Sequence, residues 1–217
     1  MPSEDASAWL KQWHDWQVQP SHEWIIAGVQ PARIQAIMAW LKERTASVHL
    51  LKSHQELPIQ IEVEHPEKVG MDRLLNAVAA NRRRQDNVAA ILIDAGTAVT
   101  VDYVDGKGVF RGGTIFPGFR LMTTSLHEHT ALLPLIDLDE AVTAPGTSTA
   151  HAIQAGVFFA VLGGIERIIN EYQHHYSAAH EIYLTGGDAK ALASRLRPHV
   201  HLWPEMTLDG ILHSRPR

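Results

Sequence analysis

The sequence has 217 residues, of which 45% are hydrophobic and 20% charged, and its formal net charge is -5. These values suit a globular protein of one large or two small domains, and they give no general attraction to nucleic acid. The absence of cysteine excludes disulfides and thiolate ligands, and without a membrane-length apolar run or a secretory leader we expect a cytoplasmic protein that contacts no membrane.

The first part of the chain predicts short strands that alternate with helices, which is typical of α/β layers. Trp9, Trp13 and Trp16 recur at helical spacing behind Ser3, a possible helix cap, and we interpret these tryptophans as core residues. The next predicted elements are an apolar strand suited to a parallel sheet, a helix that begins with a proline, a second strand, an edge or surface strand and a helix, at residues 24–29, 31–41, 48–51, 59–63 and 71–84.

A polar joint, Gln85-Asp86-Asn87, separates these elements from the rest, and we place a domain boundary there. The predicted domains are therefore residues 1–86 and 87–217. The second begins with a hairpin, AAILIDAGTAVTVDYVDG, whose apolar first strand ends in an acid, a glycine and a threonine. Further strands are predicted at 108–114, 181–184 and 199–203, and helices at 119–126, 149–172, near 191 and from about 208.

Glycine-bearing turns follow several predicted strands, at residues 94–97, 112–118 and 185–187. Glycine lets backbone N–H groups approach an anion, and a threonine hydroxyl can donate to a phosphate or coordinate a cation. A single such turn usually only satisfies a backbone angle, but together the turns leave a nucleotide site and a structural role equally open. The Walker and Rossmann glycine motifs are absent from the sequence, which excludes those two kinds of nucleotide site.

Charged residues offer two further hypotheses. Asp72 and Arg73 begin a helix, and spacing alone favours an acid that complements the helix dipole beside a surface arginine. The functional alternative is a base that takes a hydroxyl proton, with an arginine that holds an anionic substrate. Arg82-Arg83-Arg84 is better explained as the solvated end of that helix than as a phosphate site. The 14 histidines form no fixed ligand set, so we expect them to be exposed.

A set of short motifs follows in a fixed order along the chain. The motifs are Gly70-Met71-Asp72-Arg73, Asp94 to Ala98 with Thr100 and Asp102, Gly112 to Gly118, Thr149 with Ala152, Ile153 and Gly156, Leu184 to Gly187, and Leu208 to Ile211. In this order the set resembles the type III pantothenate kinase family.

The resemblance implies an actin-like α/β fold of two ribonuclease H-like domains and a homodimer with the active site at its interface. It implies transfer of the ATP γ-phosphate to the primary hydroxyl of pantothenate, which gives 4'-phosphopantothenate in the first step of coenzyme A biosynthesis. It also implies Mg²⁺ and a monovalent cation, K⁺ or NH₄⁺. This chemistry needs mainly positioning and neutralisation of phosphate charge, which a carboxylate and cations can supply.

Roles carried over from the family by matching motif follow from the same resemblance. Asp72 is expected to accept the hydroxyl proton, and Arg73 to face the pantothenate carboxylate. The remaining substrate contacts are expected from Gly70, Met71 and, across the dimer interface, Thr149. The expected nucleotide and cation residues are Gly96 and Thr97 at the phosphates, Gly186 and Gly187 near the adenosine, and Asp94 at the monovalent cation.

One family motif, Asp-x-Gly-Asn-Thr in a first phosphate loop, does not occur in the sequence. A start codon placed too far downstream would explain this, and the upstream DNA read in frame would then encode the motif. Alternatively, the chain is a non-catalytic pantothenate-binding or regulatory relative, or a phosphatase or other phosphotransferase of the same fold. In each case we expect the first domain to be incomplete, with poorly buried strands and partly exposed tryptophans.

Overall fold

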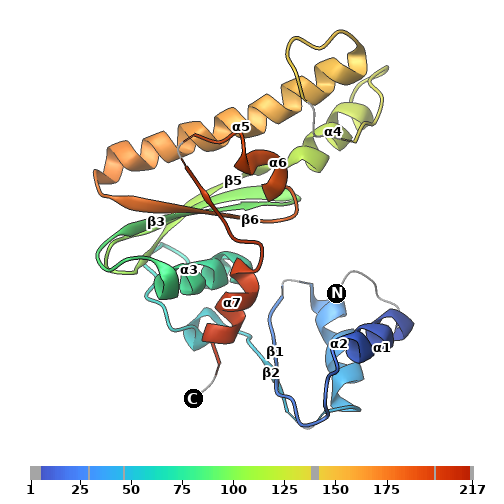
Figure 1. Ribbon diagram of the computed structural model, residues 1–217, viewed down its shortest axis with the longest axis vertical. Coiled ribbons are helices and arrows are strands. Elements are labelled where there is room, and N and C mark those ends of the chain that lie inside the picture. Colours follow the sequence, from blue (N-terminus) through green and yellow to red (C-terminus); the bar gives the residue numbers. More distant parts are fainter. Residues whose placement is uncertain (1–5, 29, 46, 138–141, 198, 216–217) are drawn as a thin grey trace.

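The computed structural model describes residues 6–28, 30–45, 47–137, 142–197 and 199–215. An N-terminal lobe contains α1 (Ala6–Asp15), β1 (Trp24–Ile26), α2 (Pro31–Lys42) and β2 (Val48–Leu50), as Figure 1 shows. The two strands pair in parallel, from Trp24 opposite Val48 to Ile26 opposite Leu50, and every residue in them is only partly buried. The poor burial expected for these strands is therefore confirmed.

The tryptophans of the N-terminal lobe form a small aromatic cluster with α2. Trp9 and Trp40 are buried, and Trp13 stacks on Trp24 with ring centroids 5.8 Å apart. Trp16 is 57% exposed, so its interpretation as a core residue is wrong. The reason is that α1 ends at Asp15, which leaves Trp16 beyond the helical face that packs on α2. The proposed cap, Ser3, lies outside the described residues.

Two short 3-10 helices, η1 (His54–Glu56) and η2 (Pro66–Lys68), connect the lobe to α3 (Met71–Arg83). The edge strand predicted at residues 59–63 is wrong, because the backbone there makes a single bridge, between Ile61 and Phe110. The alternating apolar side chains nevertheless pack against the buried cluster under α3. The alternation of apolar and polar residues at 59–63 thus correctly indicated a segment with one buried face. It did not show whether the segment pairs with another strand.

The rest of the chain is built on a five-stranded sheet in the order β5-β4-β3-β6-β7. The first three strands are antiparallel neighbours, and β6 and β7 are added in parallel. This is the strand order of a ribonuclease H-like domain, and the predicted actin-like α/β fold is confirmed. The strands are β3 (Ala89–Ala95), β4 (Ala98–Val104), β5 (Phe110–Pro117), β6 (His180–Thr185) and β7 (His201–Leu202).

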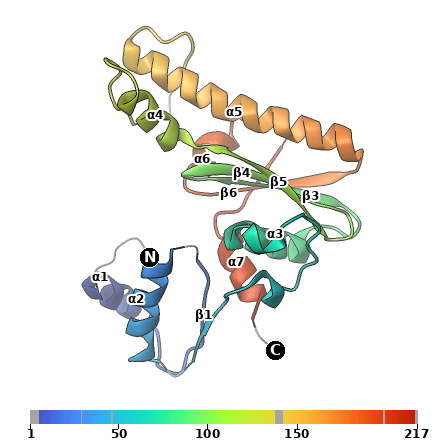
Figure 2. The ribbon, with the colours of Figure 1, turned by 180° about the vertical axis from the view of Figure 1, so that it is seen from behind.

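Helices cover both faces of this sheet. Helix α5 (Thr149–Tyr176) lies across one face, and α3 and α7 (Met206–His213) lie on the other, in both views of the molecule (Figures 1 and 2). The shorter helices α4 (Phe119–Glu128) and α6 (Ala189–Ala193) follow β5 and β6. Side chains of β3 alternate between the faces, so Ile91 and Ile93 join the α5 core while Ala90 and Leu92 join the α3 core. The alternation also turns Asp94 toward α3.

Two features of this arrangement bear on the sequence predictions. Helix α3 precedes the predicted domain boundary but packs on the five-stranded sheet, and the division into 1–86 and 87–217 stays a prediction.

Helix α5 is long and apolar enough to cross a membrane by length and composition alone, but half of its most apolar window is buried inside the protein. Core helices of soluble proteins meet the same criterion.

The crossing of α3 and α7 depends on a glycine. A Cβ atom at Gly210 would lie 2.1 Å from the carbonyl oxygen of Leu75, so Gly210→Ala forces the two helices apart. We expect this substitution to lower the free energy of unfolding by about 2 kcal/mol or more, measured by urea denaturation. Gly163→Ala is the matched control, because a Cβ in that part of α5 meets nothing within 4 Å and alanine favours the helix. Equal effects of the two substitutions would contradict the prediction.

Candidate functional site

Asp72 lies in the first turn of α3, at the end of the helix that faces the N-terminal lobe (Figure 1). Its Oδ1 accepts a hydrogen bond from the backbone N–H of Arg73 at 2.9 Å, and the side chain is exposed. A Cβ atom at Gly70 would approach that oxygen to 2.5 Å, so glycine leaves room for the carboxylate. The side chain stands at the N-terminal end of the helix, and its exposure leaves the carboxylate open to a ligand.

Arg73 points from the same turn into the protein and pairs with Asp102 of β4. The guanidinium Nε lies 3.0 and 3.1 Å from the two carboxylate oxygens, and Nη2 also donates to Oδ1. The Asp102 side chain is 1% exposed and that of Arg73 13%. Burial raises the pKa of Asp102 to about 6, and the adjacent guanidinium offsets this rise only in part. Gly113 allows the close strand pairing, since a Cβ there would lie 2.2 Å from Asp102 Oδ1.

Asp94 is the partly buried, next-to-last residue of β3, and its side chain lies on the sheet face that α3 covers, as does that of Asp102. Its Oδ2 accepts a hydrogen bond from Asn76 of α3 at 3.4 Å. Burial raises the pKa of Asp94, the Asn76 bond acts in the opposite direction, and the negative charge of Asp72 adds to the rise. The structure therefore brings Asp72, Arg73 and Asp94 together from a helix and a strand that are separate in sequence.

Glycines surround the Asp94 carboxylate at the carboxyl ends of β3 and β6. Gly186 has a φ of +99°, and a Cβ there would lie 2.6 Å from Asp94 Oδ1 and 2.3 Å from the carbonyl oxygen of Ala95. Gly96 is also adjacent, with its Cβ position 4.0 Å from the same carboxylate oxygen, while Thr97 is exposed. A Cβ at Gly187 would meet nothing within 4 Å. This strand end is thus a glycine-lined edge beside a carboxylate, and ligands of α/β sheets commonly bind at such edges.

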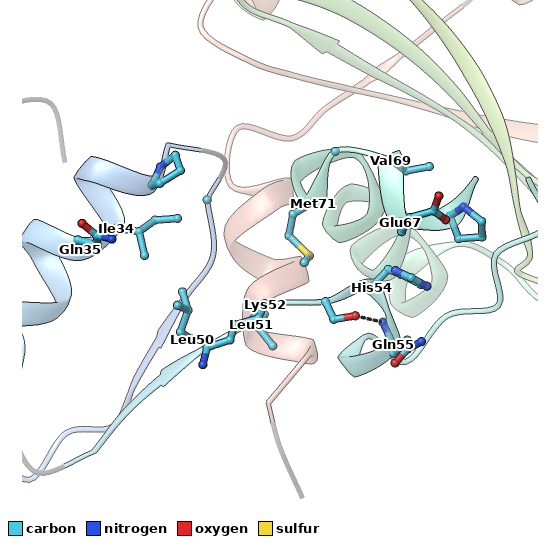
Figure 3. Close-up of a pocket in the computed structure, with 15 residues that line it drawn as sticks. Ile34, Gln35, Leu50, Leu51, Lys52, His54, Gln55, Glu67, Val69 and Met71 are labelled. Atoms are coloured by element: carbon cyan, nitrogen blue, oxygen red, sulfur yellow. Dashed lines mark hydrogen bonds between the residues drawn. The ribbon is translucent and has the colours of Figure 1, made fainter. Parts of the chain in front are cut away.

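A pocket of about 780 Å³ lies between the N-terminal lobe and the start of α3. Ile34 of α2 and Met71 of α3 lie on opposite sides of it, and Lys52, His54 and Gln55 line it between them (Figure 3). Gly70 and Met71, which were predicted to contact the substrate, are both in its lining. The pocket therefore adjoins the turn that carries Asp72 and has the size of a small-molecule site.

Thr149 is not part of this group of residues within one chain. It is exposed at the start of α5, behind the capping residue Ser148, and α5 lies on the opposite face of the sheet from α3 (Figures 1 and 2). Thr149 instead lines a mainly apolar groove of about 760 Å³ between α4 and α5, together with Pro117, Leu121 and Ala160. A contact between Thr149 and a substrate at Asp72 would need a second copy of the chain.

The arginine run at the end of α3 is solvated at Arg82 and Arg83, as expected, whereas Arg84 is partly buried. Arg84 donates to the carbonyl oxygens of Val88 and Gly106 at 2.7 and 3.0 Å, and Arg83 stacks over Trp203 with Cζ 4.5 Å from the ring centroid. Among the described residues, no three acidic or histidine side chains are grouped closely enough to hold a metal ion.

Two polar residues of the site were given no role by sequence reasoning. Asp102 pairs with Arg73, and Asn76 connects Asp94 to Thr207 of α7, whose hydroxyl donates to Asn76 Oδ1 at 2.7 Å. Asn76 is 1% exposed. A usable signal was present, because an asparagine in the middle of an apolar helical face needs a hydrogen-bond partner. The partner itself could not be read from the sequence, since it lies 131 residues further along the chain.

Comparison with known proteins shows which family the chain is similar to. The family model of type III pantothenate kinases matches residues 2–171. Type III pantothenate kinases from Rhodopirellula baltica and Akkermansia muciniphila are 39% and 32% identical to the chain over 172 and 187 residues. These alignments cover 74% and 86% of the chain, and 61% and 75% of the two relatives. The chain thus spans less than two thirds of the Rhodopirellula protein.

A solved structure gives the same fold. A Baf family transcriptional activator from Campylobacter jejuni superposes with a TM-score of 0.59 at 18% sequence identity, covering 94% of this chain and 86% of that one. The family match also begins at residue 2, well before the first of the motifs found in the sequence, so the resemblance includes the N-terminal lobe.

Proposed function

Because the chain belongs to the type III pantothenate kinase family, we propose that it is an ATP-dependent kinase that phosphorylates pantothenate to 4'-phosphopantothenate, the first step of coenzyme A biosynthesis. The observation that carries the proposal is the grouping of Asp72, Arg73 and Asp94 beside the glycine-lined strand ends and the 780 Å³ pocket. Together these offer a base, a guanidinium and a phosphate-binding edge. In line with the family, we also propose a cytoplasmic location.

In the proposed reaction the pantothenate hydroxyl lies against Asp72. The carboxylate takes the hydroxyl proton as the oxygen attacks the γ-phosphorus, and the bond from that phosphorus to the bridging oxygen breaks to release ADP. Gly70 and Met71 border the pocket for the pantothenate chain. Arg73 follows them in the same turn, and its proposed role, to supply positive charge for the pantothenate carboxylate, is carried over from the family. ATP binds along the edge formed by two glycine-bearing turns. The turn with Gly96 and Thr97 contacts the phosphates, and the turn with Gly186 and Gly187 lies near the adenosine.

The residues of the site offer a ligand for the proposed monovalent cation, and the proposed Mg²⁺ binds mainly to the ATP phosphates. Asp94 fits a monovalent cation, K⁺ or NH₄⁺, because its carboxylate stands at the strand end beside Gly96 and Gly186, and carboxylate oxygen is a suitable ligand for a cation. Mg²⁺ neutralises phosphate charge when it is bound with ATP. It is usually held by one or two carboxylates together with the phosphates, so the site does not require a cluster of acids from the protein.

The test is an assay of ADP release by the purified protein with pantothenate, ATP, Mg²⁺ and K⁺. The proposal expects ADP release that depends on pantothenate, and mass spectrometry should identify 4'-phosphopantothenate as the product. ADP release that is the same without pantothenate would indicate an ATPase or another acceptor. An absence of turnover at all substrate concentrations would overturn the proposal.

We further propose a homodimer in which the groove between α4 and α5 forms the contact and Thr149 reaches the partner's substrate. The support is the apolar lining of the groove and the 43% exposure of Leu121 beside it. Leu121→Asp is expected to convert the dimer to a monomer in light scattering and to reduce turnover. Leu10→Asp is the matched control, since Leu10 is 40% exposed on α1, and it should leave the dimer intact. A wild-type monomer would contradict this proposal.

A further inference from the structure

We propose that Asn76 is a positioning residue for the phosphate side of the site, and that Thr207 of α7 fixes its orientation. This inference rests on the proposed kinase function, but it concerns residues outside the motifs that suggested it. Asn76 is in the middle of α3, it is 1% exposed, and it lies between the Asp94 carboxylate and the Thr207 hydroxyl. Asn76 is not among the residues that line the 780 Å³ pocket.

The hydrogen bonds define which way the Asn76 amide faces. The Thr207 hydroxyl donates to Oδ1 at 2.7 Å, and this leaves Nδ2 to donate to Asp94 Oδ2 at 3.4 Å. A carboxylate can only accept hydrogen bonds, so the reversed amide would set two oxygens against each other. The threonine thus favours the one amide orientation that holds the Asp94 carboxylate, with Oδ1 toward Gly186. An asparagine supplies this contact without adding charge to a site already rich in carboxylates.

The position of Thr207 is set by contacts of α7 and of the segment that leads into this helix. Gly210 allows α7 to pack against Leu75 of α3. Trp203 lies just before α7, and its indole N–H donates to the Asp209 carboxylate, within that helix, at 2.9 Å. The backbone N–H of Trp203 donates to Leu184 at the end of β6, two residues before Gly186. The segment that leads into α7 therefore connects the glycine turn after β6 to the Asn76 amide, and both adjoin Asp94.

The proposed role of Asn76 predicts different effects on the binding of ATP and of pantothenate. If the Asn76 amide is free to rotate, Asp94 loses its buried partner and its carboxylate turns away from the cation and phosphate positions. The Asp72 turn and the pocket beside Met71 do not include this hydrogen bond, because they are formed by the first turn of α3 and by the N-terminal lobe. Loss of the Thr207 hydroxyl should therefore weaken ATP and K⁺ binding and spare pantothenate.

Two substitutions at Thr207 distinguish the hydrogen bond from packing. Thr207→Val keeps the shape and removes the hydroxyl, whereas Thr207→Ser keeps the hydroxyl and removes the methyl group. We expect Thr207→Val to raise the KM for ATP and the K⁺ concentration for half-maximal activity about fivefold each, with the pantothenate KM unchanged. Thr207→Ser should stay close to wild type. A second readout that does not depend on turnover is the rise in melting temperature caused by ATP with K⁺, which should shrink only in Thr207→Val.

Each other outcome has a defined meaning. Wild-type values for Thr207→Val in both readouts would overturn the role of the hydrogen bond, and equal impairment of both variants would show that Thr207 acts by packing. An equal rise in the pantothenate KM would show a general distortion of the site. Failure of the kinase proposal looks different, because the wild-type protein itself would then lack pantothenate-dependent turnover. The melting-temperature comparison would still decide whether Thr207 supports nucleotide binding.

Discussion

Asp72→Asn is expected to reduce pantothenate phosphorylation by a factor of about 10²–10⁴, the usual contribution of a positioned general base. Asparagine has nearly the same shape as aspartate and can accept the hydrogen bond from the Arg73 N–H, but it cannot take a proton from the substrate. The pantothenate hydroxyl would then lose its proton without help. The measurement is kcat in the ADP-release assay, together with the pantothenate affinity from calorimetry, which should change little.

The matched control is Asp86→Asn, a substitution of the same chemistry at an exposed position in the joint after α3. It should leave both kcat and stability unchanged. A kcat within about threefold of wild type for Asp72→Asn would contradict its role as the base. Asp94 would then be the next carboxylate to test, because it lies close enough to Asp72 for their charges to interact. A large loss of pantothenate affinity would instead assign Asp72 to binding.

Much of the fold could be predicted because its signals are local. The β3–β4 hairpin, the start of α2 at Pro31 and the long helix α5 all appear close to their predicted positions, since apolar period and turn residues act within a few positions. The errors come from tertiary contacts. The alternation at residues 59–63 could not reveal that only Ile61 finds a strand partner, and helical spacing could not reveal that α1 stops before Trp16.

The site shows the same division. The motif that contains Asp72 and the turn after Asp94 could be found in the sequence, and the structure brings them together on one face of the sheet. What the sequence could not indicate is the use of the neighbouring polar residues. Arg73 was expected to face a substrate anion, but in the folded chain its guanidinium is held by Asp102, a buried acid on a strand 29 residues away. Its contact with a substrate carboxylate stays a prediction.

This buried ion pair leads to the largest expected effect on stability. Arg73→Met leaves the Asp102 carboxylate, 1% exposed, without its counter-charge, and breaking a buried pair in this way typically costs about 3–5 kcal/mol. We expect a loss of this size at pH 8, measured by urea denaturation. Arg167→Met is the control, because it breaks an ion pair on α5 in which the arginine is 77% exposed, and it should have little effect.

The loss should also depend on pH, and the direction follows from the raised pKa of Asp102. Burial already raises this pKa to about 6 in the wild-type protein, so the folded state keeps a proton that the unfolded state loses near pH 4. The associated stability is present below about pH 4 and is lost as the pH rises through 6. Removing Arg73 raises the pKa of Asp102 further, because desolvation then acts without the opposing guanidinium charge. The loss caused by Arg73→Met should therefore be small at pH 5 and grow toward pH 8. The double variant Arg73→Met with Asp102→Leu should regain most of the lost stability, and its stability should no longer depend on pH in this range, because the titrating carboxyl is gone. If the loss caused by Arg73→Met alone is the same at every pH, Asp102 is not the group responsible.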